Sequence, residues 1–328
     1  MRVHIIAIII PDIIVVDIAV DGKKYYFEVL YDFLKENQYI YDRHMNLKWR
    51  RDIERYYRYY DWDEKLCERI KQQYGYNARN VLLVNSKKFY MIAQYYRKTV
   101  VISNLRIAIV FLLLGCLLDH LLDAGDENQK KIARKKLSWT YCGEYFMGAT
   151  ELKEDDVIDE LYSELACAFS KIHEETPIVY VQLLENIKIA VSAELNAVSI
   201  SASNDEQLIM NKSALFVLIA GMIGMYDMPN LKEIKEFFWK MGEIFAIIDD
   251  LCDFYEDREN GQKNMVNMLI MDVGEENAIK RLITRLNDTM NQVENTMPAQ
   301  IYMLLLMQVQ EWTMSNDYLR ERIWLENG

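Results

Sequence analysis

The stretch GEIFAIIDDLCDFYED, residues 242–257, joins an apolar run to a series of aspartates. Its apolar half favours a buried helix, and residues four apart on a helix share a face. Asp249, Asp253 and Asp257 would therefore line one face over two turns. Like charges at that spacing repel each other, and charges at the buried end of a helix need a partner. We expect that partner to be Mg²⁺, a hard cation that prefers carboxylate oxygens.

A second acidic pair, Asp119 and Asp123, ends another apolar run, residues 107–118. This pair also has helical spacing, and helix bundles build metal sites from side chains on facing helices. We therefore predict an all-α fold in which the two acidic faces point at each other across a central cavity and share Mg²⁺. Both faces lie near the C-terminal ends of their expected helices, where the helix dipole also favours a cation.

The composition supports a helical protein. Among 328 residues, 51% are hydrophobic, and only 4 Pro and 12 Gly occur, which favours long helices over a β-sandwich or a disordered chain. The net charge is −12 and no long basic stripe is present, so nucleic-acid binding is not expected. The five cysteines are scattered and form no CxxC pair, which is typical of reduced thiols in a cytoplasmic protein.

The chain divides into an N-terminal extension, residues 1–26, and one α-helical domain, residues 27–328. Two β-prone runs flank Asp21-Gly22, which predicts strands that pair through a turn there. The apolar run at 107–118 is too short to cross a bilayer, so we expect a core helix and no integral membrane segment. The expected helices are 27–37, 48–74, 86–123, 129–147, 152–173, 177–200, 205–225, 230–258, 274–295 and 299–323.

Residues 242–257 resemble the second aspartate-rich motif of the class I isoprenoid synthase superfamily. This superfamily contains the trans-isoprenyl diphosphate synthases and the terpene synthases that share their fold. Asp249, Asp250 and Asp253 match the Asp-Asp-x-x-Asp pattern of that motif. Asp249, Asp253 and Asp257 also fit the alternative metal triad of terpene cyclases.

Two further elements carry the same resemblance. The sequence KSALF at 212–216 is similar to the Lys-Thr-x-x-Leu-Phe element of these families, in which the Lys contacts the diphosphate. Lys212 precedes Asp249 by 37 residues, a spacing typical of the family. The sequence DHLLD at 119–123 resembles the first aspartate-rich motif, with His120 in place of the middle Asp. Glu194 lies where the family often has a polar residue beside the substrate.

Some family elements are incomplete. Chain-elongating members carry Gly-Gly-Lys-x-x-Arg upstream, whereas GYNAR at 75–79 keeps one Gly and Arg79 and lacks the Lys. These members also place Arg-Arg-Gly after the first motif, where only Lys130, Lys131 and Arg134 could stand in. Arg320, near Tyr318, lies about where cyclases carry an Arg-Tyr diphosphate sensor, in a different order. The missing parts of the second-substrate site favour a cyclase over a prenyltransferase.

The resemblance implies a Mg²⁺-dependent terpene synthase that ionises an allylic prenyl diphosphate, releases pyrophosphate and cyclises the carbocation, and that could form a homodimer. A trans-prenyltransferase that joins allylic and isopentenyl diphosphates is the first alternative. A non-catalytic helical partner subunit is the second, and the loss of an Asp at His120 keeps it open. The implied metal ligands are Asp119, Asp123, Asp249, Asp250, Asp253 and Asp257. The implied diphosphate-binding residues are Lys212, Arg79, Lys130 and Arg320.

Overall fold

The structure is a computed structural model that contains two compact units. The large unit comprises Arg51–Glu243, and the split unit comprises Met1–Arg50 together with Ile244–Gly328. The described residues are 3–10, 13–20, 57–79, 81–82, 89–90, 92–93, 96, 101–142, 156–199, 206–261, 264–297, 302 and 305.

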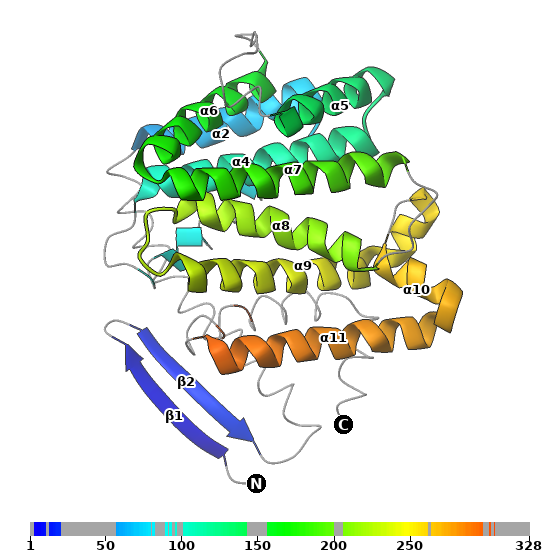
Figure 1. The fold of residues 1–328 in the computed structure, drawn as a ribbon. Helices are drawn as coiled ribbons and strands as arrows, with labels where there is room; N and C mark the ends of the chain where they lie inside the picture. The colour runs from blue at the N-terminus through cyan, green and yellow to red at the C-terminus, as the bar shows by residue number, and fades with distance from the viewer. Residues whose placement is uncertain are drawn as a thin grey trace. The chain divides into compact units, whose positions relative to one another are not determined.

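Helices make up the described part of the large unit (Figure 1). The helix α8 lies against both α4 and α7, while α5 and α6 each contact α4 and α7, and α2 contacts α6. The helices are α2 (Tyr57–Tyr74), α4 (Ile102–Asp123), α5 (Glu127–Cys142), α6 (Val157–Glu175), α7 (Pro177–Ser199), α8 (Glu206–Gly224) and the first part of α9 (Leu231–Asn260).

The most apolar of these helices, α4, is a core element of the large unit. Among the described residues it is the one helix long and apolar enough to cross a membrane, judged by length and composition. However, 61% of its most apolar window is buried inside the protein. It also packs against α5, α6 and α8, as the expected core helix would.

Small residues let α8 approach its neighbours closely. The ring of Phe216 on α8 covers Gly115 of α4, and a Cβ at Gly115 would lie 2.2 Å from that ring. The ring of Phe238 on α9 covers Gly221 of α8 in the same way, at 2.1 Å. Any larger side chain at either glycine would displace an aromatic ring from the core, because protein interiors are close-packed.

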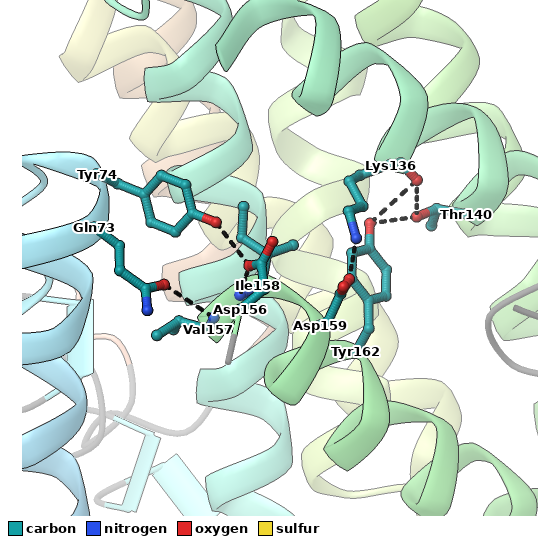
Figure 2. A network of polar contacts seen from close by, with 9 residues as sticks. All are labelled: Gln73, Tyr74, Lys136, Thr140, Asp156, Val157, Ile158, Asp159 and Tyr162. Carbon is teal, nitrogen blue, oxygen red and sulfur yellow. Dashed lines mark hydrogen bonds and ion pairs between the residues drawn. The ribbon is translucent and has the colours of Figure 1, made fainter. Parts of the chain in front are cut away.

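Buried and half-buried polar contacts join α2, α5 and α6 (Figure 2). Lys136 on α5 forms a buried ion pair with Asp159 on α6. Thr140 donates to the carbonyl oxygen of Lys136 at 2.9 Å, and its hydroxyl lies 2.5 Å from that of Tyr162. These side chains satisfy one another in a region from which water is excluded, as buried polar groups must. We call Lys136, Thr140, Asp159 and Tyr162 the partnered network.

A second group of contacts at the start of α6 ties this helix to α2 (Figure 2). The Asp156 carboxylate accepts from the backbone N–H of Ile158 at 2.9 Å and so caps α6. The same carboxylate oxygen accepts from the Tyr74 hydroxyl of α2 at 2.7 Å. The side chain of Gln73 accepts from the backbone N–H of Val157 at 3.1 Å. The cap therefore also fixes where α2 meets α6.

The split unit begins with a two-stranded antiparallel sheet, β1 (Val3–Ile10) and β2 (Ile13–Val20). Val3 pairs with Val20 and Ile10 with Ile13. The strands expected within residues 1–26 are present as β1 and β2, and the predicted turn at Asp21-Gly22 lies outside the described residues. In the sequence, Pro11 separates two β-prone runs of equal length, residues 3–10 and 13–20.

The split unit continues with the last part of α9, from Ile244, and with α10 (Met265–Val273) and α11 (Glu275–Thr296). The helices α10 and α11 pack on each other. Asn264 caps α10 by accepting from the backbone N–H of Val266 at 2.9 Å. Gly274, with φ +81°, ends α10 and precedes α11. A backbone angle in that range favours glycine, which explains the abrupt end of α10.

The predicted all-α class is confirmed, and most expected helices are present within a few residues. Two differences stand out, one at a helix boundary and one a helix that was not expected. The expected helix 86–123 does not run through Val101, whose extended backbone precedes α4. The expected helix 274–295 is preceded by α10, which the sequence analysis missed. The expected helix 27–37 lies outside the described residues, as does 299–323 apart from residues 302 and 305.

Candidate functional site

The Lys212 amine of α8 lies among carboxylates of the large unit. It is 3.5 Å from Oδ1 of Asp119 on α4 and forms a closer ion pair with Oε2 of Glu194 on α7. The helices α4, α7 and α8 therefore bring these three side chains together. We call Asp119, Glu194 and Lys212 the lysine cluster.

The lysine cluster contains two carboxyl groups and one amine, and these groups shift each other's pKa values. Burial alone would lower the pKa of Lys212, but the carboxylates of Asp119 and Glu194 outweigh it, so this pKa is raised. Burial also raises the pKa of Glu194; the Lys212 amine opposes that shift, and the neighbouring Asp119 adds to it. The Lys212 and Asp119 side chains remain 35% and 51% exposed, so a solute can reach both. The lysine thus stays protonated within reach of an incoming anion.

Tyr76 is a neighbour of the cluster that the sequence analysis did not single out. Its ring lies 5.0 Å from the ring of His120, centroid to centroid, at an angle of 38°. Burial raises the pKa of Tyr76, and the nearby Cys116 and Asp119 raise it further. The incomplete element at 75–79 therefore lies beside the first acidic pair. Its glycine, Gly75, has φ +72°, a conformation that glycine favours.

Gly242 explains why the lysine-bearing part of α8 lies against α9. A Cβ at Gly242 would lie 2.6 Å from the Cα of Ala214 and 3.0 Å from the carbonyl oxygen of Ser213. Both atoms belong to the backbone, so they could move aside only if helix α8 itself were displaced. The glycine that opens the second motif is therefore in contact with the residues that follow Lys212, which joins two sequence elements at one helix crossing.

The split unit contains the acidic end of α9. Asp249 is exposed, whereas Asp253 and Asp257 are half-buried. We call these three residues the aspartate face. Burial raises the pKa of Asp253 to about 7, and the charges of Asp249 and Asp257 contribute to the shift. Oδ1 of Asp253 is buried and has no hydrogen-bond partner among the described residues.

Asp250 has different surroundings. Its Oδ2 accepts from the backbone N–H of Met265 at 2.6 Å. Its backbone oxygen accepts from the side-chain amide of Asn264 at 2.8 Å, and the same amide donates to Oδ2 of Asp257 at 2.9 Å. Burial raises the pKa of Asp250 to about 7, while the Met265 N–H opposes that shift and the three neighbouring aspartates add to it. Asp250 thus joins α9 to the start of α10.

The donors of the aspartate face suit Mg²⁺. Within the described ranges no three His, Cys, Asp or Glu side chains form a ready-made metal site. However, the face offers hard carboxylate oxygens, one of which is buried without a partner at Asp253. A buried unpaired carboxylate is costly, and a cation removes that cost. The aspartate face therefore has the oxygen donors that the predicted Mg²⁺ needs, although its carboxylates are not already gathered around one point.

The remaining predicted residues have varied positions. Asp123 is the last residue of α4 and is exposed, and Arg79 is also exposed. Lys130 is half-buried in the first turn of α5. Arg320 lies outside the described residues. The lysine cluster belongs to the large unit and the aspartate face to the split unit, so the predicted central cavity between them stays a prediction.

Comparisons with known proteins include a distant likeness to a solved structure. No protein-family model matches the sequence, and no curated protein matches it. Among solved structures, the chain is similar to a variant of cucumene synthase with 12% sequence identity and a TM-score of 0.44. The match covers 80% of this chain and 94% of that one. An identity and a TM-score this low do not establish a shared fold or function, and the helical class is assigned from the helices of the structure.

Proposed function

We propose that this chain is a Mg²⁺-dependent class I terpene synthase that ionises an allylic prenyl diphosphate and cyclises the resulting carbocation. The observation that carries the proposal is the aspartate face, in which Oδ1 of Asp253 is buried without a hydrogen-bond partner among the described residues. A stable fold does not gain from such a group, so it is best explained by a cation that binds it. The motif resemblance supplies the reaction class.

The carboxylates of both acidic regions would bind metal. Asp119 and Asp123 would contribute from α4, and the aspartate face would contribute from α9. Bound Mg²⁺ supplies positive charge that stabilises pyrophosphate as a leaving group. Acidic helix ends suit this task, because the helix dipole there adds to the attraction for a cation.

Lys212 would bind the diphosphate directly. Its amine is held by Glu194 and Asp119 in the present structure, and its raised pKa keeps it protonated. A diphosphate oxygen would replace Asp119 as its partner once that carboxylate is engaged elsewhere. Arg79, Lys130 and Arg320 are the further cations proposed to contribute. Exclusion of water would then let the carbocation close on its own double bonds.

The test is incubation of the purified chain with Mg²⁺ and geranyl, farnesyl or geranylgeranyl diphosphate, each with and without isopentenyl diphosphate. A hydrocarbon or alcohol from one allylic diphosphate alone, with pyrophosphate release, is the expected result. A longer diphosphate formed only with isopentenyl diphosphate would instead identify a prenyltransferase. Recovery of every diphosphate unchanged would contradict catalysis and favour a non-catalytic partner subunit.

A further inference from the structure

Asn267 is a polar residue in an otherwise apolar stretch of α10, since every other residue from Met265 to Met271 is apolar. Its side-chain amide donates to the backbone oxygen of Phe254 on α9 at 2.7 Å. The opposite orientation of the amide would bring two oxygens together, so this hydrogen bond fixes which branch faces α9. Oδ1 of Asn267 is therefore directed away from the Phe254 carbonyl.

The oxygen of this amide is buried and has no hydrogen-bond partner among the described residues. Within the same part of the chain, Oδ1 of Asp253 is also buried and without a partner. Both oxygens belong to residues that adjoin Phe254, one along the chain and one through the hydrogen bond. A carboxylate oxygen and an amide oxygen only accept, so they cannot satisfy each other. Each of them needs a donor or a cation.

A purely structural link between α9 and α10 does not explain Asn267. The Phe254 carbonyl lies inside α9, which continues to Asn260, so the helix itself supplies a backbone donor for it. The additional bond from Asn267 is therefore not required to satisfy that carbonyl. A leucine of similar shape would pack against α9 without leaving a polar oxygen buried, and a buried acceptor without a partner is costly.

The start of α10 does not exclude a cation, although a helix dipole carries about half a positive charge at its N-terminus. The Asp250 carboxylate accepts from the first N–H of α10, at Met265, and the Asn264 side chain accepts from the next, at Val266. These contacts satisfy donors that would otherwise repel a cation. The carboxylates of the aspartate face then outweigh the remaining dipole.

We infer that Asn267 completes the cation site of the aspartate face from α10, with its amide oxygen turned to a hydrated Mg²⁺. The inference rests on the proposed function and deepens it, because Asn267 lies outside both aspartate-rich motifs. Mg²⁺ takes oxygen ligands and keeps several of its waters, from which an amide oxygen can accept. The hydrogen bond to Phe254 would hold that oxygen in place before the ion arrives.

The matched variants are Asn267→Leu and Asn277→Leu. Asn277 is the third residue of α11, as Asn267 is of α10, and its amide also donates to a backbone oxygen, that of Val273 at 3.0 Å, but it is exposed. The readout is the rise in melting temperature on adding Mg²⁺ with inorganic pyrophosphate, because a ligand that binds only the folded state raises it. The Mg²⁺ concentration for half of the rise should increase about tenfold in Asn267→Leu and stay unchanged in Asn277→Leu.

A second variant, Asn267→Asp, separates a cation site from a structural role. Both Asn267→Leu and Asn267→Asp remove the amide that donates to Phe254, but only Asn267→Asp keeps an oxygen and adds a negative charge. Without Mg²⁺, the added charge beside the aspartate face should lower the melting temperature below that of the wild type. With Mg²⁺ and pyrophosphate, the rise should exceed the wild-type rise, whereas Asn267→Leu changes it in the opposite direction.

A wild-type Mg²⁺ requirement in Asn267→Leu would overturn the inference while leaving the proposed function intact. A rise in Asn267→Asp that is smaller than that of the wild type would also overturn it, since the buried oxygen would then face something other than a cation. If the wild-type chain itself shows no rise with Mg²⁺ and pyrophosphate, the proposed function fails, and the inference that rests on it fails too.

Discussion

The partnered network and the aspartate face show two ways of placing charge inside one protein. In the partnered network, the buried carboxylate of Asp159 faces the Lys136 amine, and the hydroxyls around them are hydrogen-bonded (Figure 2). In the aspartate face, three carboxylates share two helical turns, and a buried oxygen of Asp253 has no partner among the described residues. The polar groups of the partnered network have partners within the protein, whereas the aspartate face lacks a counter-charge that a bound cation would supply.

That difference separates a structural role from a functional one. A buried ion pair with its hydrogen bonds complete holds helices in register, although it adds little net stability over apolar packing. A buried acidic group without a counter-charge raises the free energy of the folded state and persists where function requires it. The two regions should therefore respond in opposite ways when a charge is removed.

The largest effect is expected on activity from Asp249→Ala. The change removes one ligand from the aspartate face and should reduce turnover of the allylic diphosphate below detection, by about ten-thousandfold, or ~5 kcal/mol of transition-state stabilisation. Helix content, measured by circular dichroism, should stay that of the wild type because Asp249 is exposed. Full activity in this variant would remove the aspartate face from the mechanism.

The next effect is on stability, from Lys136→Met. Asp159 is only 2% exposed and would be left as an uncompensated buried charge, so the free energy of unfolding should fall by roughly 3–5 kcal/mol. Urea denaturation followed by circular dichroism measures the change. The matched double variant Lys136→Met with Asp159→Leu should recover most of the loss. A single variant as stable as the wild type would show that this pair is not buried in solution.

A smaller effect concerns pH and Tyr162. Burial raises the pKa of this phenol above its ordinary value, so the folded state holds the proton more tightly than the unfolded state. Stability should therefore be constant below the unfolded pKa near 10 and fall above it by about 1.4 kcal/mol per pH unit from this group. Tyr162→Phe should remove that part of the alkaline slope and cost about 1 kcal/mol at neutral pH. Identical slopes in the two proteins would contradict the burial of the hydroxyl.

The smallest effect is expected from an exposed ion pair. Lys171 and Glu175 lie one helical turn apart on α6 at 3.9 Å, and both are about half exposed. Lys171→Ala should change the free energy of unfolding by less than about 0.5 kcal/mol, since water screens the pair. The same urea titration used for Lys136→Met measures it. A loss as large as that of Lys136→Met would mean that burial does not decide how much an ion pair contributes to the free energy of unfolding.

Much of the fold could be predicted from the sequence because long apolar runs and few breakers dictate helices. The expected helix 177–200 differs from α7 by one residue, and 205–225 differs from α8 by one residue at each end. The register of the N-terminal strands, with Ile10 opposite Ile13, could not be predicted in this way, because strand pairing and not a local turn signal decides it.

The candidate site likewise contains residues that could be predicted from the sequence and residues that could not. The resemblance singled out Lys212 for the diphosphate and Asp119 for metal, and the structure places the Lys212 amine 3.5 Å from Asp119. Asn264 was missed because its contacts with Asp250 and Asp257 cross the turn between α9 and α10, which no periodicity describes. Its place directly before the apolar run of α10 was an available signal, since Asn at that position commonly caps a helix. Tyr76 gave no such signal.

The most direct test of the proposed function is pyrophosphate release from geranyl, farnesyl and geranylgeranyl diphosphate, each offered alone, with Mg²⁺ and with excess chelator. We expect release from at least one of them with Mg²⁺, no release with chelator, and a product that lacks the diphosphate. Intact diphosphates after incubation with Mg²⁺, from a chain with full helix content, would contradict it.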